Sequence, residues 1–418
     1  MLINLDYGRH GLMVDIPDDA VVIEPAHQPG LQDEHAAFRE AVRAPIHAPR
    51  LAEVAHPTDR VCIVIADGTR PSPSERLVPW ILAELTHVPR DRFVILVGTG
   101  THRPNTPGEL EAMLGSDVLA SVEVINHNAF ERSELVHLGQ LTDGGPVWLN
   151  RRWVEADVRI VTGFIEPHLF AGFSGGAKGI CPGVAGFDTI MHLHRASLIA
   201  DPRATWAILE DNPVQQGIRE AVAMAPPHFL VNVALNRARQ ITGIYAGDYL
   251  HAHAVGCREV ADVVLRSVDG PFDVVVTTNS GYPLDQNLYQ SVKGVSAAAR
   301  IVREGGAILL VSECADGLPD HGNYRQILEM RETPQALLEM VQSPGFRMQD
   351  QWEVQVQAAI QVWADVYVYS TLRPDQVQAA KLIPVTDVQA AIEDLRQRYG
   401  HRLAVLPQGP LTVPQNAD

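Results

Sequence analysis

The chain has 418 residues, of which 46 % are hydrophobic and 20 % charged. This composition is typical of globular proteins, and a chain of this length exceeds what one hydrophobic core usually organises, so we expect two domains. The formal net charge of -17 argues against sequence-independent binding of nucleic acid, because such binding depends on lysine and arginine neutralising phosphates.

The cysteines and the N-terminus bear on cellular location. Four cysteines are scattered without a C-x-x-C spacing, which argues against a zinc ribbon or a disulfide scaffold and fits a reducing cytoplasm. The opening MLINLDYGRHGLMVDIP alternates polar and apolar residues and lacks the apolar region of a signal peptide, and no later run approaches the ~18 apolar residues of a membrane span. We therefore expect a cytoplasmic protein.

Short apolar, β-branched runs alternate with helical stretches along most of the chain. After a hairpin-like opening, strands are predicted at 61–66, 93–98, 122–126, 158–164 and 229–235, and again at 272–279, 306–313 and 366–370. Near-continuous apolar strands separated by helices indicate parallel sheets covered on both faces. A helical stretch between the two sets ends at Gly270-Pro271. We predict an α/β fold in which two domains, residues 1–268 and 269–418, flank a central cleft.

Ligands of open parallel sheets bind beyond the carboxyl ends of the strands. The stretches at those positions are DGTRPSP, TGTHRP, IEPHLFAGFSGGAKG and SGYPLDQNLYQSVKG.

The glycine-rich stretch at 172–179 resembles a phosphate-binding loop only in part. A P-loop ends in G-K-[ST], whose hydroxyl binds magnesium, whereas here Gly172, Phe173, Ser174, Gly175 and Gly176 lead to Ala-Lys-Gly. Backbone amides of 174–177 can still form an anion nest. Alternatively, the glycines only let a turn approach the sheet closely.

Lys178 lies among small and apolar residues without a neighbouring acid. Desolvation at such a position lowers the pKa of a lysine and makes its amine nucleophilic. Schiff-base chemistry and covalent cofactor attachment are both open, as is an ordinary solvated lysine.

Two histidines, His102 and His168, follow strand ends. Imidazole accepts and returns a proton near neutral pH, so two histidines in one cleft can serve one substrate from opposite faces. Asp67 and Arg70 follow another strand, and a guanidinium there is a natural partner for a substrate carboxylate.

A predicted helix in LYQSVKG places Tyr289, Gln290 and Lys293 on one face, because residues three and four apart are neighbours on a helix. His192 and His194 are two apart and cannot share a helical face. At most one of these two histidines is therefore expected to bind a ligand.

Five motifs together are similar to those of the nickel-pincer lactate racemases and their 2-hydroxyacid racemase and epimerase relatives. They are YGRHGLMVDIP, DGTRP, GTGTHRP, PHLFAGFSGGAKGICPG and PLDQNLYQSVKG, in the family's order and near its spacing. The resemblance covers nearly the whole chain.

The resemblance implies a racemase or epimerase that transfers hydride reversibly to a nickel-pincer nucleotide, a pyridinium-3-thioamide-5-thiocarboxylate mononucleotide that holds Ni. By resemblance, Lys178 is the covalent attachment point and His194 the nickel ligand. Acid/base roles fall to His102 and His168, and substrate binding to Arg70, Gln290 and Lys293. The remaining expected cofactor contacts are Asp67, Thr69, Ser174, Gly175, Gly176, Tyr289 and Trp352.

The substrate expected from the resemblance is a small 2-hydroxyacid, either lactate or a malate-like dicarboxylate. Arg103 and Arg195 adjoin candidate histidines, and a second guanidinium near the substrate would favour the dicarboxylate. Cofactor-synthesis enzymes are the expected partners, with neither nucleic acid nor membrane involved. Two alternatives are a Schiff-base enzyme that uses Lys178 on keto acids and a catalytically silent homologue that only binds the cofactor.

Overall fold

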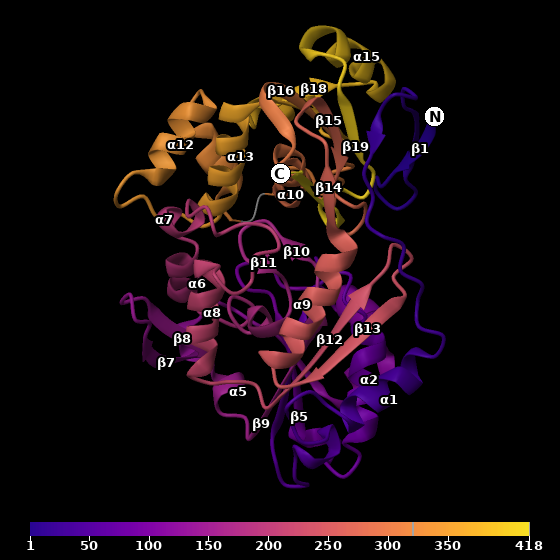
Figure 1. The fold of residues 1–418 in the computed structure, drawn as a ribbon. Helices are drawn as coiled ribbons and strands as arrows, with labels where there is room; N and C mark the ends of the chain where they lie inside the picture. The colour runs from indigo at the N-terminus through magenta and orange to yellow at the C-terminus, as the bar shows by residue number, and fades with distance from the viewer. Residues whose placement is uncertain (320–321, 418) are drawn as a thin grey trace.

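The apolar stretches predicted as strands form two six-stranded sheets in the computed structural model, which describes residues 1–319 and 322–417 (Figure 1). The first sheet has the order β13-β12-β9-β4-β5-β6. Its strands are β4 (Val61–Ala66), β5 (Phe93–Gly98), β6 (Glu123–Asn126), β9 (Val158–Phe164), β12 (Phe229–Leu235) and β13 (Ile241–Gly247). All neighbours run parallel except β12 and β13, which are joined by a short turn.

The second sheet is parallel throughout, with the order β18-β17-β16-β15-β19-β3. Its strands are β3 (Val21–Val22), β15 (Phe272–Thr278), β16 (Val302–Val311), β17 (Asp365–Tyr369), β18 (Ile383–Val385) and β19 (Leu403–Leu406). Strand β16 begins four residues before the predicted 306, at Val302.

Helices cover both faces of each sheet, as the apolar character of the strands requires. One face of the first sheet packs on α1 (Glu34–Arg43), α2 (Ser74–Glu84), α3 (Pro107–Leu114) and α4 (Ser116–Ser121). The other packs on α5 (Arg151–Val154), α6 (Phe187–Leu193), α8 (Pro213–Ala223) and α9 (His251–Val264).

The second sheet lies between α15 (Val388–Tyr399) on one face and α10 (Leu288–Ala299) and α13 (Gln351–Trp363) on the other. The remaining helices are α7 (Ala196–Ile199), α11 (Tyr324–Glu329), α12 (Pro334–Gln342) and α14 (Pro374–Ala379). Short strand pairs complete the fold: β1 (Leu2–Leu5) with β2 (Leu12–Asp15), β7 (Leu135–Gln140) with β8 (Pro146–Asn150), and β10 (Pro167–His168) with β11 (Gly172–Phe173).

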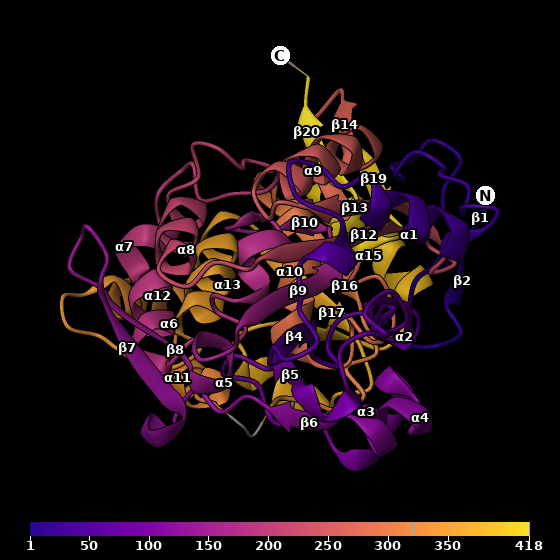
Figure 2. The same ribbon diagram turned by 90° about the horizontal axis from the view of Figure 1, so that it is seen from below.

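The chain crosses between the two sheets twice. The β1–β2 hairpin packs its buried Leu5 and Val14 on the second sheet, and β3 pairs with β19, so the first 22 residues associate with the C-terminal unit. The predicted division at 268/269 takes no account of this pairing, because a two-residue strand has no recognisable pattern. Near that division β14 (Leu265–Val268) lies beside β20 (Val413–Asn416), as Figure 2 shows.

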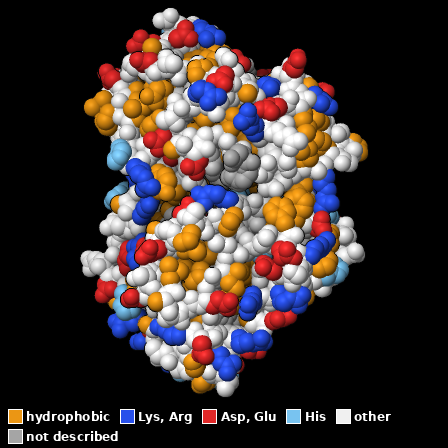
Figure 3. Space-filling view, turned by 180° about the vertical axis from the view of Figure 1, so that it is seen from behind, with side chains coloured by type: hydrophobic (Ala, Val, Ile, Leu, Met, Phe, Trp, Pro, Cys, Tyr) orange, Lys and Arg blue, Asp and Glu red, His pale blue; other side chains and the backbone are white. Residues whose placement is uncertain are grey.

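Within the described residues, no helix has both the length and the apolar character needed to cross a membrane. On the face shown in Figure 3, acidic and basic side chains are interspersed rather than gathered by sign.

Candidate active site

A cavity of about 150 Å³ lies where the carboxyl ends of β4, β5 and β9 face α10 and α13. Strands β4, β5 and β9 start in register at Val61, Phe93 and Val158, so their following loops meet at one edge of the sheet. Most of the predicted site residues line this cavity: Asp67, Arg70, His102, His168, Ser174, Gly175, Lys178, His194, Tyr289, Gln290, Lys293 and Trp352. Thr69 and Gly176 do not.

Two of the three lysines in the whole chain line this one cavity. Elsewhere the chain uses arginine almost exclusively for positive charge. Arginine stays protonated in any protein environment, whereas a buried lysine can lose its proton. The two cavity lysines, Lys178 and Lys293, are therefore the cations of this site whose charge the fold can adjust.

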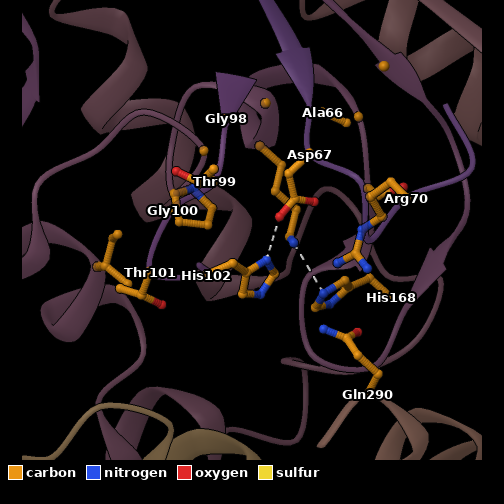
Figure 4. Close-up of a pocket in the computed structure, with 18 of the residues that line it drawn as sticks. Ala66, Asp67, Arg70, Gly98, Thr99, Gly100, Thr101, His102, His168 and Gln290 are labelled. Atoms are coloured by element: carbon orange, nitrogen blue, oxygen red, sulfur yellow. Dashed lines mark hydrogen bonds and ion pairs between the residues drawn. The ribbon is translucent and has the colours of Figure 1, made fainter. Parts of the chain in front are cut away.

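His102 is oriented by a carboxylate. Its Nδ1 lies 2.7 Å from Oδ2 of Asp67, a contact that Figure 4 draws as a dashed line. Nδ1–H therefore donates, and Nε2 is left as the basic nitrogen. Burial alone would raise the pKa of Asp67, but His102 and Arg70 outweigh it and keep the carboxyl ionised. The hydroxyl of Thr69 donates to Oδ1 of Asp67 at 2.6 Å. Thr69 therefore supports the carboxylate from outside the cavity.

His168 and Lys178 form a second pair. The backbone N–H of Ala171 donates to Nδ1 of His168 at 3.3 Å, and Nε2 of His168 lies 3.1 Å from Nζ of Lys178. Since Nδ1 accepts, Nε2 carries the ring proton and donates it to an unprotonated amine. Burial, with Arg70 and Lys293 nearby, lowers the pKa of Lys178 to about 7. Burial also lowers the pKa of His168 well below its usual range. The predicted desolvation of Lys178 is confirmed.

The glycine-rich loop that precedes Lys178 uses part of its backbone amides within the fold. The N–H of Ser174 donates to the carbonyl of Glu166, and the N–H of Gly176 donates to Oδ1 of Asn232 at 2.8 Å. Two of the four amides expected in the nest are thus already used within the fold, which disfavours an anion nest at this loop. Gly175 adopts φ +77, and a Cβ there would lie 2.5 Å from Oδ1 of Asn232.

His194 and His192 point to different surroundings. His194 is buried, lines the cavity and donates from Nδ1 to the carbonyl of Ile190 at 2.8 Å, which leaves Nε2 as a free donor atom for a metal. Burial lowers the pKa of His194 to about 4, so the ring is neutral at pH 7. His192 instead pairs with Asp143 at 2.8 Å outside the cavity.

The C-terminal unit supplies the facing wall. Nε1 of Trp352 donates to the hydroxyl of Tyr289 at 2.9 Å, and the ring centroids of Trp352 and His194 lie 4.5 Å apart. Nζ of Lys293 donates to Oε1 of Gln290 at 2.6 Å. The predicted helical face of Tyr289, Gln290 and Lys293 is confirmed by their shared cavity.

Two carboxyl groups in this region escaped prediction. Glu166 lies 3.6 Å from Nε of Arg70, and its place directly after a strand could have revealed it. Glu353 is buried in the first turn of α13, lines the cavity, and has no hydrogen-bond partner for Oε1 among the described residues. Burial raises the pKa of Glu353 and lowers that of Lys293. Nothing in the helical sequence around Glu353 distinguishes it.

The two arginines proposed to favour a dicarboxylate are engaged elsewhere. Arg103 makes two hydrogen bonds to Glu109, at 2.7 and 2.8 Å, and Arg195 pairs with Asp143 at 2.8 Å. Neither lines the main cavity. By contrast, Nη1 of Arg70 is buried without a partner among the described residues, which makes it available to an anionic ligand.

Comparison with known proteins gives consistent results over nearly the whole chain. Residues 7–207 match the family model of the lactate racemase N-terminal domain, and residues 268–413 match that of the C-terminal domain. A lactate racemase of Thermoanaerobacterium thermosaccharolyticum is 33 % identical and one of Lactiplantibacillus plantarum is 34 % identical, each over 97 % of this chain and at least 97 % of its own.

Solved structures agree with the sequence matches. The lactate racemase apoprotein of Thermoanaerobacterium thermosaccharolyticum superposes with a TM-score of 0.91 at 31 % identity, covering 99 % of this chain and all of the other. This match confirms the predicted fold class. A Thermotoga maritima protein shares the fold with a TM-score of 0.70 at 20 % identity, over 88 % of this chain and 96 % of its own. Both halves of the chain match the same family, and the protein therefore belongs to the lactate racemase family of isomerases.

Proposed function

We propose that the protein racemises or epimerises a small 2-hydroxyacid by reversible hydride transfer, with a nickel-pincer nucleotide as cofactor. The observation that carries the proposal is the pair of independently oriented imidazoles, His102 and His168, in one cavity with Arg70. Nη1 of Arg70 has no partner in the part of the chain that the structure describes. Enantiomers have equal free energy, so a racemase must work on either face of its substrate. Two imidazoles in one site, one that takes a proton and one that gives a proton, meet that demand.

The residues present fit such a cofactor. Lys178, an amine with a pKa near 7, is nucleophilic at neutral pH and would form the covalent attachment. His194 would bind nickel through its free Nε2, since imidazole suits this metal. Among the described residues, no three His, Cys, Asp or Glu side chains gather as a metal-binding group. His194 as the proposed protein ligand therefore suits a metal whose other ligands belong to the cofactor.

The bound cofactor would supply the hydride acceptor. Arg70 would bind the substrate carboxylate through Nη1, with Gln290 and Lys293 across the cavity as further polar contacts. His102 would take the hydroxyl proton at Nε2, because its Nδ1 is held by Asp67. His168 would act from its own side as the proton donor, because its Nε2 carries the ring proton and is free for the substrate oxygen once Lys178 is bonded to the cofactor. General acid/base help of ~10² to 10⁴-fold is expected from each histidine.

The test is nickel analysis and a racemisation assay after co-expression with cofactor-synthesis enzymes, the partners that the proposal requires. We expect one nickel per chain and interconversion of the enantiomers of at least one acid among lactate, glycerate, malate and phenyllactate. Cofactor-loaded protein without stoichiometric nickel and without activity on the whole panel would overturn the proposal.

A second candidate follows from the same amine. An unprotonated lysine 3.1 Å from an imidazole also suits a Schiff base with a keto acid. Borohydride treatment of cofactor-free protein with pyruvate distinguishes the two: a stable adduct at Lys178, seen by mass spectrometry, favours the Schiff-base enzyme, and its absence excludes it.

A further inference from the structure

A second cavity, of about 140 Å³, adjoins the main one. The two share the lining residues Asp67, Thr101, His102, Tyr289 and Gln290. We call the second cavity the side pocket. Arg70 lines the main cavity but not the side pocket, and His102 stands between them. For a substrate with its carboxylate on Arg70 and its hydroxyl at His102, the side pocket would be the space beside His102 that is open to its third carbon.

The side pocket contains a polar side chain that the fold holds in place without satisfying it. Asn105 is only 8 % exposed, and its Oδ1 has no hydrogen-bond partner among the described residues. Its backbone is fixed on both sides by Asn126, which accepts from its N–H at 3.0 Å and donates to its carbonyl at 3.0 Å. At Gly68, an added Cβ would lie 2.6 Å from Nδ2 of Asn105. The space for this amide is thus created by a residue without a side chain.

An amide that is buried without a partner costs free energy unless a ligand satisfies it. A carboxamide offers an acceptor at one end and a donor at the other. An alcohol hydroxyl both donates and accepts, so it pairs with whichever end faces the cavity. A methyl group pairs with neither, and a carboxylate can only accept.

The charges around the side pocket disfavour a carboxylate. Arg103 lines it, but both of its terminal nitrogens are engaged by Glu109. Apart from Arg103 and His102, the titratable side chains that line it among the described residues are two tyrosines and the acidic residues Asp67, Glu109, Asp316 and Asp350. A second carboxylate would meet negative charge that the one guanidinium does not offset.

We propose that the side pocket selects 2-hydroxyacids that carry a hydroxyl on the third carbon, with Asn105 as the specificity-determining residue. This inference rests on the proposed racemase function and names its substrate class: polyhydroxy acids in preference to alkyl or dicarboxylic ones.

Racemisation of glycerate, lactate and malate by cofactor-loaded protein tests the inference. We expect kcat/KM for glycerate to exceed that for lactate by roughly 10-fold or more, the value of one buried hydrogen bond. Asn105→Leu keeps the branched shape and the number of side-chain heavy atoms and removes both polar ends. It should abolish this preference while changing lactate turnover by less than about threefold, because a methyl group gains nothing from the amide.

Glu109→Gln is an independent variant that keeps the helix-capping hydrogen bond to the Thr106 N–H but releases the charge of Arg103. It should raise kcat/KM for malate relative to glycerate by about 10-fold. Melting curves show whether each variant is folded. Turnover of all three acids at equal efficiency, or equal loss for glycerate and lactate in Asn105→Leu, would overturn the inference but not the racemase function. No turnover of any acid by wild type would overturn both.

Discussion

The N-terminal unit reaches the cavity through loops that follow β4, β5 and β9, whereas the C-terminal unit reaches it through the faces of α10 and α13. The N-terminal unit contains the two proposed acid/base histidines, the proposed attachment lysine and the proposed metal ligand. Of these, His102 is held by Asp67 and His194 by the carbonyl of Ile190. The helix side contributes the amide, phenol and ammonium groups of Gln290, Tyr289 and Lys293. The N-terminal unit thus supplies the proposed acid/base groups, and the C-terminal unit supplies the facing wall of the cavity.

The largest expected effect is on the loop side, at the attachment lysine. Lys178→Ala removes the one nucleophilic amine positioned beside His168, so covalent cofactor and stoichiometric nickel should be lost completely. Intact mass and nickel content after co-expression measure this. Lys381→Gln, at the third lysine and outside the cavity, is the matched control and should retain both. Full nickel in Lys178→Ala would show that attachment is not required.

The next largest effect is expected at the two histidines. His102→Ala and His168→Ala should each lower kcat by ~10² to 10⁴-fold, because each removes a positioned acid/base. Nickel content should stay at the wild-type level, since neither residue is the proposed metal ligand. If one variant loses activity and the other does not, the proposed arrangement of two acid/base histidines is wrong.

On the helix side we expect a change in pH dependence rather than loss of activity. Burial raises the pKa of Glu353 and lowers that of Lys293, and the Glu353 carboxylate favours the charged ammonium. Glu353→Gln removes that support. Lys293 should then lose its proton at lower pH and hold an anionic substrate less well in alkali. The alkaline limb of the pH profile of kcat/KM should shift to lower pH by about one unit, while kcat/KM at pH 6 changes little.

An unchanged alkaline limb in Glu353→Gln, with the fold intact by circular dichroism, would show that Glu353 does not influence Lys293. Glu353→Asp is the conservative comparison, since it keeps the charge and should restore part of the wild-type profile.

The smallest effect is expected at the aromatic contact on the helix side. Tyr289→Phe removes the acceptor for Nε1 of Trp352 but keeps both rings. Loss of one neutral hydrogen bond, about 1 kcal/mol, corresponds to roughly fivefold. This loss should appear in KM more than in kcat, because the substitution weakens the contact between α10 and α13 and leaves the proton-transfer groups in place. A loss in kcat as large as that of the histidine variants would mean that the helix side takes part in the chemistry.

Much of this protein follows from local sequence. The apolar runs predicted most strands to within a residue or two, because strands buried on both faces must be apolar along their length. The strand-end rule led to Asp67, His102 and His168, and the helical period placed Tyr289, Gln290 and Lys293 together. Each of these inferences needs only neighbours within one turn or one strand.

Tertiary structure decided what depends on partners distant in sequence. Asn232, 56 residues from Gly176, occupies an amide that the loop alone would leave for an anion. Glu109 binds Arg103, and Asp143 binds Arg195. Glu353 becomes a buried carboxyl of the cavity only because α13 packs against α10. The sequence determines the charge and the hydrogen-bonding capacity of each side chain. Packing between elements decides which of these groups remain unpaired, and the unpaired groups are those that a ligand can bind.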